Sequence, residues 1–460
     1  MTATKHGTHT AMESAPDAAG KGTISLAGGV AMGTGVMIGA GIFALTGQIA
    51  ELAGPLFPLS FVLGALVTSL AAYSYIKMSN AWPSSGGIAM ILQKAYGPGV
   101  VAASASLLMA LSMVINESLV ARTFATYALR PFGLEENSLL LSALALGLIV
   151  FAYIVNKAGN RSVSGFSLVM SAIKIGGIAL FAVAAIAASG FFSGAFAEPA
   201  SMTSGGAFLA SVAFSILAFK GFTTITNSGG EIVDPHRNVG RTIMISIAIC
   251  VVTYLLVAFA VGSSLTIGQI VEARDYSLAA AARPALGELG FWFTIVIAIA
   301  ATTSGVIASV FAVSRMLTML TEMKMIPHSH FGMSGPIQRH LLVYVAVLAA
   351  LATVLFDLGR IASLGVFLYL TMDVIVQVGI LRRLRARVEA RGWILCTAIG
   401  LDLVVLAAFG RAKLLEDPWI VAIAAGLIGV VFVLERAWVG NWVSAPQADE
   451  PGGHHHHPST

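Results

Sequence analysis

Long apolar stretches, separated by short polar clusters, recur along almost the whole of this 460-residue chain. A helix needs about 20 apolar residues to cross the hydrocarbon core of a bilayer. The stretches lack the alternation of apolar and polar residues that membrane β-strands require. Charged residues make up only 10% of the chain, against about 25% in an ordinary soluble domain. The sequence therefore predicts an all-α polytopic membrane protein.

The apolar stretches predict about twelve membrane-spanning helices. We expect them at residues 26–50, 55–79, 99–128, 138–156, 163–190, 205–230, 240–264, 288–320, 340–357, 361–381, 393–411 and 418–438. Because twelve is an even number, both ends of the chain should lie on the same side of the membrane.

Lys and Arg residues gather in the connections on one side of this arrangement. The side that holds the N-terminus carries Lys77, Lys94, Lys157, Arg161, Arg237, Arg241, Lys324, Arg339, Arg382, Arg383, Arg385, Arg387 and Arg391. Because basic connections stay in the cytoplasm, we expect a multi-pass protein of the cytoplasmic membrane with both termini cytoplasmic. The polar segments 1–22 and 441–460 would then be cytoplasmic tails. The net charge of +4 reflects this topology, so no nucleic-acid partner is expected.

Several functional classes lack their characteristic residues in this sequence. No His, Cys or carboxylate cluster has the spacing of metal ligands, and neither a nucleophile elbow nor a phosphate-binding loop is present. Rings of charge and repeated filter sequences, which ion channels use, are also missing. We therefore expect neither an enzyme nor a channel, and neither a metal nor an organic cofactor. Cys250 and Cys396 both lie in apolar stretches, so no disulfide framework is expected.

Glycines interrupt two of the expected spans. The first span contains four glycines within nine positions, from Gly33 to Gly41, and the sixth contains Gly221 near mid-depth. If the first ten spans form two halves of five, these are the opening spans of each half. Paired Gly-interrupted helices at matching positions indicate the central site of a transporter. The alternative, close helix packing through small residues, stays open.

The glycine-rich stretch Gly35-Val-Met-Ile-Gly39-Ala-Gly41-Ile-Phe43 resembles the first-helix signature of the amino acid, polyamine and organocation (APC) transporter superfamily. Further segments that are similar to family signatures are Pro83-Ser-Ser-Gly86-Gly87, Ala95-Tyr96-Gly97, Glu231-Ile-Val-Asp-Pro235-His-Arg237-Asn238-Val239-Gly240-Arg241, Thr302-Thr303-Ser304 and Ser314-Arg315. The resemblance covers residues from about 26 to 440 in order. Two departures, Ala89 in place of a Tyr and Gly240 in place of a Pro, lie in connections.

The resemblance implies an inverted five-plus-five repeat of the LeuT type. The first repeat would occupy residues 23–192 and the second residues 200–385, followed by two additional transmembrane helices within 390–440. It also implies alternating access around a site at the membrane midplane. Within the superfamily, the chain resembles the proton-coupled amino acid permeases.

A broken helix leaves backbone groups unpaired at mid-membrane, where only a cavity or a polar ligand can satisfy them. Free N–H groups at Ala40 and Gly41 would suit a carboxylate, and the resemblance implies that the carbonyls of Met37, Leu217 and Lys220 would suit an ammonium. An α-amino acid carries both groups, and it is the small-molecule substrate that we expect. The residues expected around it are Met37, Ile38, Gly39, Ala40, Gly41, Asn116, Glu117, Leu217, Phe219, Lys220, Gly221, Phe222 and Thr223.

Lys174 lies near the middle of the fifth span, where an ionisable residue is costly and by default functional. It resembles a lysine of proton-coupled family members whose ammonium lies where sodium-coupled relatives hold an ion. That likeness implies contacts with the Gly35 and Ile38 carbonyls and with the Thr303 and Ser304 hydroxyls. Protonated Lys174 would then tie spans one, five and eight together, with the proton as coupling ion. A lysine permanently paired for structural reasons is the alternative.

Lys220 is unexpected, because family members more often place a neutral residue at that point. Its ammonium would repel the amino group of a substrate. Three explanations stay open: Lys220 is neutral by desolvation, it pairs with Glu117, or it binds an additional anionic group of the substrate. We favour the pairing, since buried charges are usually paired or neutralised. Thr223 stands where polyamine and agmatine-type relatives carry a glutamate, which argues against a dicationic substrate.

These residues favour a proton-coupled amino acid symporter. An amino acid exchanger that does not use sodium is the nearest alternative, and Lys174 favours coupling because an exchanger needs no ion. A nutrient sensor that uses the same fold without net transport is a further alternative. Beyond the lipid bilayer and the small-molecule substrate, no obligatory protein partner is evident.

Overall fold

The computed structural model describes residues 22–84, 86–158, 160–198, 204–323 and 337–443. Within these ranges the regular secondary structure is helical, apart from one isolated parallel bridge between Ile24 and Ile232. The all-α prediction is therefore confirmed. The two expected tails lie almost wholly outside the described residues.

A helix, or in one case a pair of helices, coincides with each of the twelve expected spans. They are α1 (Leu26–Ala53), α2 (Phe57–Ala81), α4 (Val100–Leu129), α5 (Ser138–Ala158), α6 (Asn160–Ser189), α7 (Gly205–Phe219) with α8 (Phe222–Asn227), α9 (Pro235–Ser264), α11 (Ser277–Glu322), α12 (Ile337–Leu355), α13 (Leu358–Gly379), α14 (Gly392–Glu416) and α15 (Pro418–Val443). By length and hydropathy, ten stretches of the described chain could cross a membrane. One of these stretches contains both α1 and α2, and α12 adds a shorter apolar helix.

Local sequence explains where several of these helices begin and break. Pro235 stands at the first turn of α9, where its missing N–H has no intrahelical partner to lose. Asp357 caps α13 by accepting a hydrogen bond from the Arg360 backbone N–H at 2.9 Å. Gly287, with a φ of 67°, interrupts α11. Two short helices, α3 (Gly87–Tyr96) and α10 (Ile267–Glu272), lie in connections, and Thr266 and Gln269 form a capping box on α10.

The expected break in the first span was wrong, because α1 continues as one helix through all four glycines. The glycines are instead points of close approach between helices. A Cβ atom on Gly39 would lie 3.0 Å from the Ala301 carbonyl oxygen, and one on Gly41 would lie 2.8 Å from that of Ala218. Close packing through small residues therefore explains this span. The sixth span does break, between α7 and α8.

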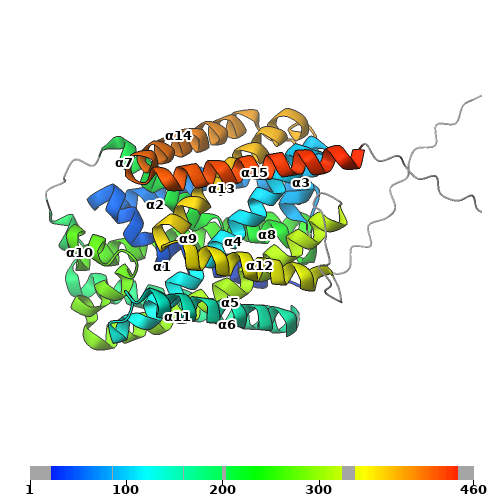
Figure 1. The fold of residues 1–460 in the computed structure, drawn as a ribbon. Coiled ribbons are helices and arrows are strands. Elements are labelled where there is room, and N and C mark those ends of the chain that lie inside the picture. The colour runs from blue at the N-terminus through cyan, green and yellow to red at the C-terminus, as the bar shows by residue number, and fades with distance from the viewer. Residues whose placement is uncertain (1–21, 85, 159, 199–203, 324–336, 444–460) are drawn as a thin grey trace, which may run out of the picture.

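The helices form one bundle, with α14 and α15 along one side of it and α5 and α6 along the opposite side (Figure 1). When spans one to five are matched in order with spans six to ten, two helix–helix contacts have counterparts. The contact of α4 with α13 corresponds to that of α11 with α6, and the contact of α1 with α9 corresponds to that of α7 with α2. The central helix α1 packs against α6, α7, α9 and α11.

Large apolar side chains cover much of the outer surface as well as the core, and a few charged side chains are buried inside. Leu139, Leu180 and Val433 are among the many large apolar residues on the outer surface. By contrast, Lys174 and Asp402 are fully buried in the interior. This distribution, together with the length of the helices, identifies a multi-pass membrane protein.

Candidate functional site

The break between α7 and α8 lies at Lys220 and Gly221, near the middle of the bundle. Across the break, backbone hydrogen bonds join residues three apart instead of four. The Lys220 N–H donates to the Leu217 carbonyl at 3.2 Å, and the Thr223 N–H donates to the Lys220 carbonyl at 3.0 Å. This tighter winding displaces the carbonyls that precede it from regular α-helical pairing. One of them, at Ala218, lies 3.0 Å from the Tyr254 hydroxyl of α9.

Tyr254 also links the break to α1. Its hydroxyl lies 2.7 Å from the Met37 carbonyl oxygen, so it can donate its proton either to α1 or to α7. Gly221 allows the two segments to meet, since a Cβ atom there would lie only 2.7 Å from the Met37 backbone nitrogen. The φ of Gly221 is −55°, so space and not backbone conformation requires glycine.

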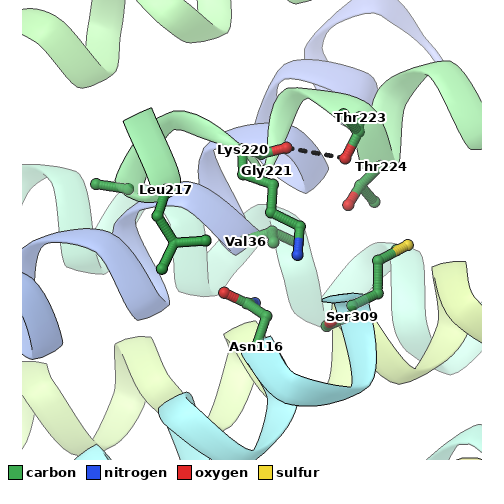
Figure 2. Close-up of a pocket in the computed structure, with 10 residues that line it drawn as sticks. Val36, Asn116, Leu217, Lys220, Gly221, Thr223, Thr224 and Ser309 are labelled. Carbon is green, nitrogen blue, oxygen red and sulfur yellow. Dashed lines mark hydrogen bonds between the residues drawn. The ribbon is translucent and has the colours of Figure 1, made fainter. Parts of the chain in front are cut away.

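A small cavity adjoins this break (Figure 2). It is lined by Val36, Met113, Asn116, Leu217, Ala218, Lys220, Gly221, Thr223, Thr224 and Ser309. The cavity volume is about 10 Å³, which is roughly the room that one water molecule needs. The walls have therefore closed on one another, and a molecule larger than water can enter only if they move apart.

Lys220 extends from the break toward α4 (Figure 2). Its Nζ donates to both the carbonyl and the hydroxyl oxygen of Ser112, at 2.6 Å each, and lies 5.6 Å from the ring centre of Tyr369. Among the described residues, no ion pair within 4.0 Å joins Lys220 to Glu117, so the expected direct pairing is not formed. The Lys220 side chain extends instead to Ser112, which lies more than one helical turn before Glu117 on α4.

Glu117 is fully buried on α4 and has few partners. Its Oε1 accepts a hydrogen bond from the Ser309 hydroxyl at 3.4 Å, while its Oε2 has no hydrogen-bond partner in the described structure. A buried carboxylate without a contacting cation is unstable unless it is protonated or meets a positive group. The site therefore holds an unsatisfied acceptor next to the cavity residue Asn116.

Lys174 of α6 is fully buried and reaches two other helices. Its Nζ donates to the Gly35 carbonyl of α1 at 3.0 Å and to the Ser304 hydroxyl of α11 at 3.4 Å. In the described residues no hydrogen bond joins it to Ile38 or Thr303, and no carboxylate pairs with it. The ammonium thus depends on neutral oxygens alone.

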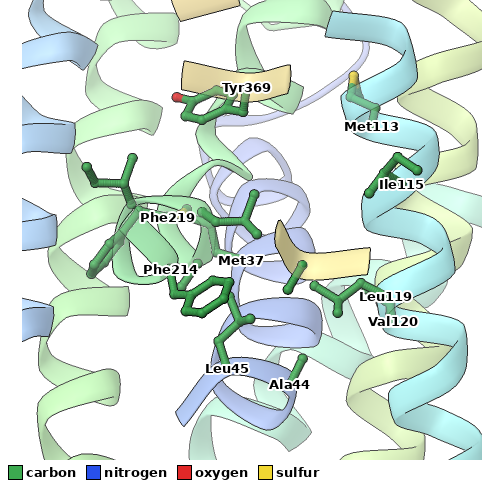
Figure 3. Packing of buried hydrophobic residues seen from close by; sticks show 14 of the residues in the cluster. Met37, Ala44, Leu45, Met113, Ile115, Leu119, Val120, Phe214, Phe219 and Tyr369 are labelled. Carbon is green, nitrogen blue, oxygen red and sulfur yellow. The ribbon is translucent and has the colours of Figure 1, made fainter. Parts of the chain in front are cut away.

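The remaining residues expected at the site lie in packed surroundings. The Phe219 ring packs 4.8 Å from that of Tyr254, and the Phe222 ring lies edge-on to Tyr75 at 5.4 Å. Neither phenylalanine lines the cavity. Met37 and Phe219 belong to the apolar core between α1, α4 and α7 (Figure 3). Ile38 is fully buried, and Ala40 lies in α1 but its side chain falls outside the described part of the structure.

Sequence reasoning missed Ser112, Tyr254 and Tyr369, and it also missed five cavity residues, Val36, Met113, Ala218, Thr224 and Ser309. Serines and tyrosines occur throughout the spans, so their residue type gave no signal. Spacing offered a clue in one case, because Ser112 lies four residues before Asn116 and therefore on the same face of α4.

Comparisons with known proteins agree over nearly the whole chain. The family model described as "Amino acid permease" matches residues 24–449. The inner membrane transport protein YbaT of Escherichia coli is 29% identical over 385 residues, which is 83% of this chain and 88% of that protein. An uncharacterized protein of Methanocaldococcus jannaschii is 30% identical, over 77% of this chain and 81% of its own length. Cationic amino acid transporter 5 of Arabidopsis thaliana is 26% identical, over 83% of this chain and 68% of its own.

Proposed function

This chain belongs to the amino acid permease family, and on that premise we propose that it is a proton-coupled amino acid symporter of the cytoplasmic membrane. The observation that carries the coupling is the position of Lys174. Its ammonium joins α6 to α1 and α11 through two neutral oxygens, with no carboxylate among the described residues to hold its charge permanently. A cation held in this way can lose its proton more readily than one in an ion pair.

In this proposal, protonation of Lys174 changes how firmly three helices are tied. The protonated ammonium donates to the Gly35 carbonyl and the Ser304 hydroxyl together, and charged donors make stronger hydrogen bonds than neutral ones. Loss of the proton weakens both bonds and frees α1 to move against α6 and α11. Because α1 also borders the cavity through Val36, proton release and opening of the site are mechanically linked.

The substrate that we propose is an α-amino acid bound at the break between α7 and α8. Its ammonium would meet the carbonyls displaced there and the unpartnered oxygen of Glu117. Its carboxylate would meet either Lys220 or the N–H groups of Gly39, Ala40 and Gly41. Those N–H groups lie within the continuous helix α1, so their use requires α1 to open locally.

The movement that we propose is alternating access between two five-helix repeats, at residues 23–192 and 200–385, with both termini cytoplasmic. The matched helix contacts, α4 with α13 and α6 with α11, support such a repeat. The family supports transport and not catalysis as the activity.

Uptake of single radiolabelled amino acids into proteoliposomes, with and without an inward proton gradient, tests the coupling. We expect the gradient to drive accumulation by the wild type and Lys174→Ala to abolish that accumulation. Lys157→Ala is the control, because Lys157 is exposed in the last turn of α5, and it should accumulate substrate normally. Uptake that occurs only into preloaded vesicles and ignores the gradient would show an exchanger in which Lys174 is structural.

A further inference from the structure

Two buried acids, separate from the cavity, face each other between α13 and α14. Asp373 on α13 is 1% exposed and Asp402 on α14 is fully buried. The Gln377 Nε2 atom donates to Asp373 Oδ2 and to Asp402 Oδ2, at 2.7 Å each. Since both oxygens lie 2.7 Å from the same nitrogen, they are at most twice that distance apart.

The hydrogen bonds of this group are unequal. Asp373 is satisfied on both oxygens, because the Tyr75 hydroxyl of α2 donates to its Oδ1. Asp402 Oδ1 and Gln377 Oε1, by contrast, have no hydrogen-bond partner in the described structure although both side chains are fully buried. Two orphaned acceptors in one cluster indicate that a donor belongs there.

Among the described residues, no Lys or Arg side chain supplies that donor. Neither acid has an ion pair within 4.0 Å, and the titratable groups that act on the pair are Tyr75 of α2 and Tyr369 of α13. From the other helices around α13, Tyr96 of α3 donates to a backbone carbonyl and Lys220 binds Ser112. No described hydrogen bond or ion pair joins the acids to Glu117 of α4, to Glu435 of α15 or to the arginines that follow α13.

Two carboxylates held this close inside a protein cannot both stay ionised without a cation. A metal cation does not fit between them, because the amide N–H groups of Gln377 point at both carboxylates from that position. A proton needs no extra room, and it removes one of the two charges, so that Asp402 becomes a neutral acid beside the ionised Asp373. We propose that Asp373 and Asp402 form a second proton-binding site, with the proton held on Asp402.

The pair lies toward the ends of α13 and α14 that segment 380–391 joins. Asp373 lies six residues before the end of α13, and Asp402 lies ten residues after the start of α14. At 1.5 Å per residue, the two acids lie about 9 Å and about 15 Å from those helix ends. On release, the O–H bond of Asp402 breaks, its electron pair stays on the carboxylate, and a water molecule that reaches the pair accepts the proton.

The site does not depend on proton-coupled transport, and its test can be made without substrate. Infrared spectra of the full chain in lipid, recorded at neutral pH, report the carbonyl band of protonated carboxylic acids. We expect a component of this band in the wild type to be lost in Asp402→Asn, which keeps the shape of the side chain. Glu117→Gln and Glu435→Gln, which remove the other two buried acids of the described spans, should leave that component in place.

An unchanged band in folded Asp402→Asn protein would overturn the proposal. Should that variant not fold, isotope labelling of the wild type replaces it. A ¹³C label in the aspartate carboxyl groups should shift the neutral-pH band, whereas the same label in glutamate should leave it in place. A band that shifts only with labelled glutamate would overturn the proposal equally.

Discussion

Single residues decide how closely the central segments meet, and Gly221 is the clearest case. We expect Gly221→Ala to separate α1 from the break in the sixth span, because its Cβ would lie 2.6 Å from the Met37 Cγ and 2.7 Å from its backbone nitrogen. Overpacking of this kind costs about 1–3 kcal/mol of stability. The variant should unfold at a lower temperature and transport poorly, as measured by thermal unfolding in detergent and by uptake.

Gly147→Ala is the matched control, because nothing lies within 4 Å of a Cβ added at that position of α5. Alanine is the better helix former there, so stability should be unchanged or slightly higher. Equal behaviour of the two variants would mean that the contact of Gly221 with Met37 does not matter.

The candidate site shows what residue types can and cannot reveal. Lys174 and Lys220 stood out in the sequence because charged residues are rare at mid-membrane. The family resemblance named two partners of Lys174, the Gly35 carbonyl and the Ser304 hydroxyl. The partner of Lys220 did not stand out, because Ser112 uses a backbone carbonyl and a common hydroxyl. The direction in which a lysine side chain extends depends on packing, so the sequence could not separate Ser112 from Glu117 as the partner of Lys220.

At the scale of elements, the connections hold two aspartates whose proton affinities change on folding in opposite directions. Burial raises the pKa of Asp275, although Arg274 and the hydrogen bond from Gln48 oppose the shift. The hydrogen bond from Arg360 lowers the pKa of Asp417. A pKa that is raised on folding stabilises the folded state at pH values below the ordinary aspartate pKa of about 3.9, and this stabilisation is lost as the pH rises through the raised pKa. A pKa that is lowered on folding stabilises the folded state at pH values above about 3.9, and this stabilisation is lost as the pH falls through the lowered pKa.

The two Asp→Asn variants should therefore respond to pH in opposite ways. Relative to the wild type, Asp275→Asn should gain stability as the pH rises from about 4 to neutral, because the amide never ionises. Asp417→Asn should be less stable than the wild type at neutral pH, and the difference should shrink as the pH falls. Unfolding temperatures measured across this range check both expectations, and a shift of the same sign in both variants would contradict them.

Element positions were predictable from hydropathy because the membrane sets helix length, and all twelve expected spans coincide with helices. The continuity of α1 was not predictable, because glycine serves two purposes. In α1 it allows close contact with α11 and α7, and the helix stays continuous. At Gly221 it accompanies a real break. Only the packing partners distinguish the two cases.

At the scale of the whole molecule, one end of the bundle is closed by contacts between distant segments. The Arg315 guanidinium of α11 pairs with the Glu231 carboxylate, at 2.5 Å, just after α8. The backbone of Glu231 also accepts a hydrogen bond from the Ile24 N–H at 2.9 Å, before α1 begins. These two contacts tie the segment before α1, the segment after α8 and helix α11 together, on the side that we propose is cytoplasmic.

We expect Arg315→Ala to open this end more often. A cysteine introduced by Thr224→Cys, in a chain with Cys250→Ala and Cys396→Ser, should then react faster with a maleimide added from that side. Arg436→Ala, at an exposed position of α15, should not change the rate. Exchange of the two charges by Arg315→Glu with Glu231→Arg should restore the slow rate, and failure of the single variant to accelerate labelling would exclude a gating role.

The nearly filled cavity has a consequence for pharmacology. A ligand binds only to molecules whose cavity has opened, so its measured affinity is its intrinsic affinity reduced by the fraction of molecules that are open. A small substrate lets the walls close again and is carried, whereas a bulky analogue holds them apart. The tightest binders of this protein should therefore be found among blockers, and ranking compounds by affinity will not rank them by turnover.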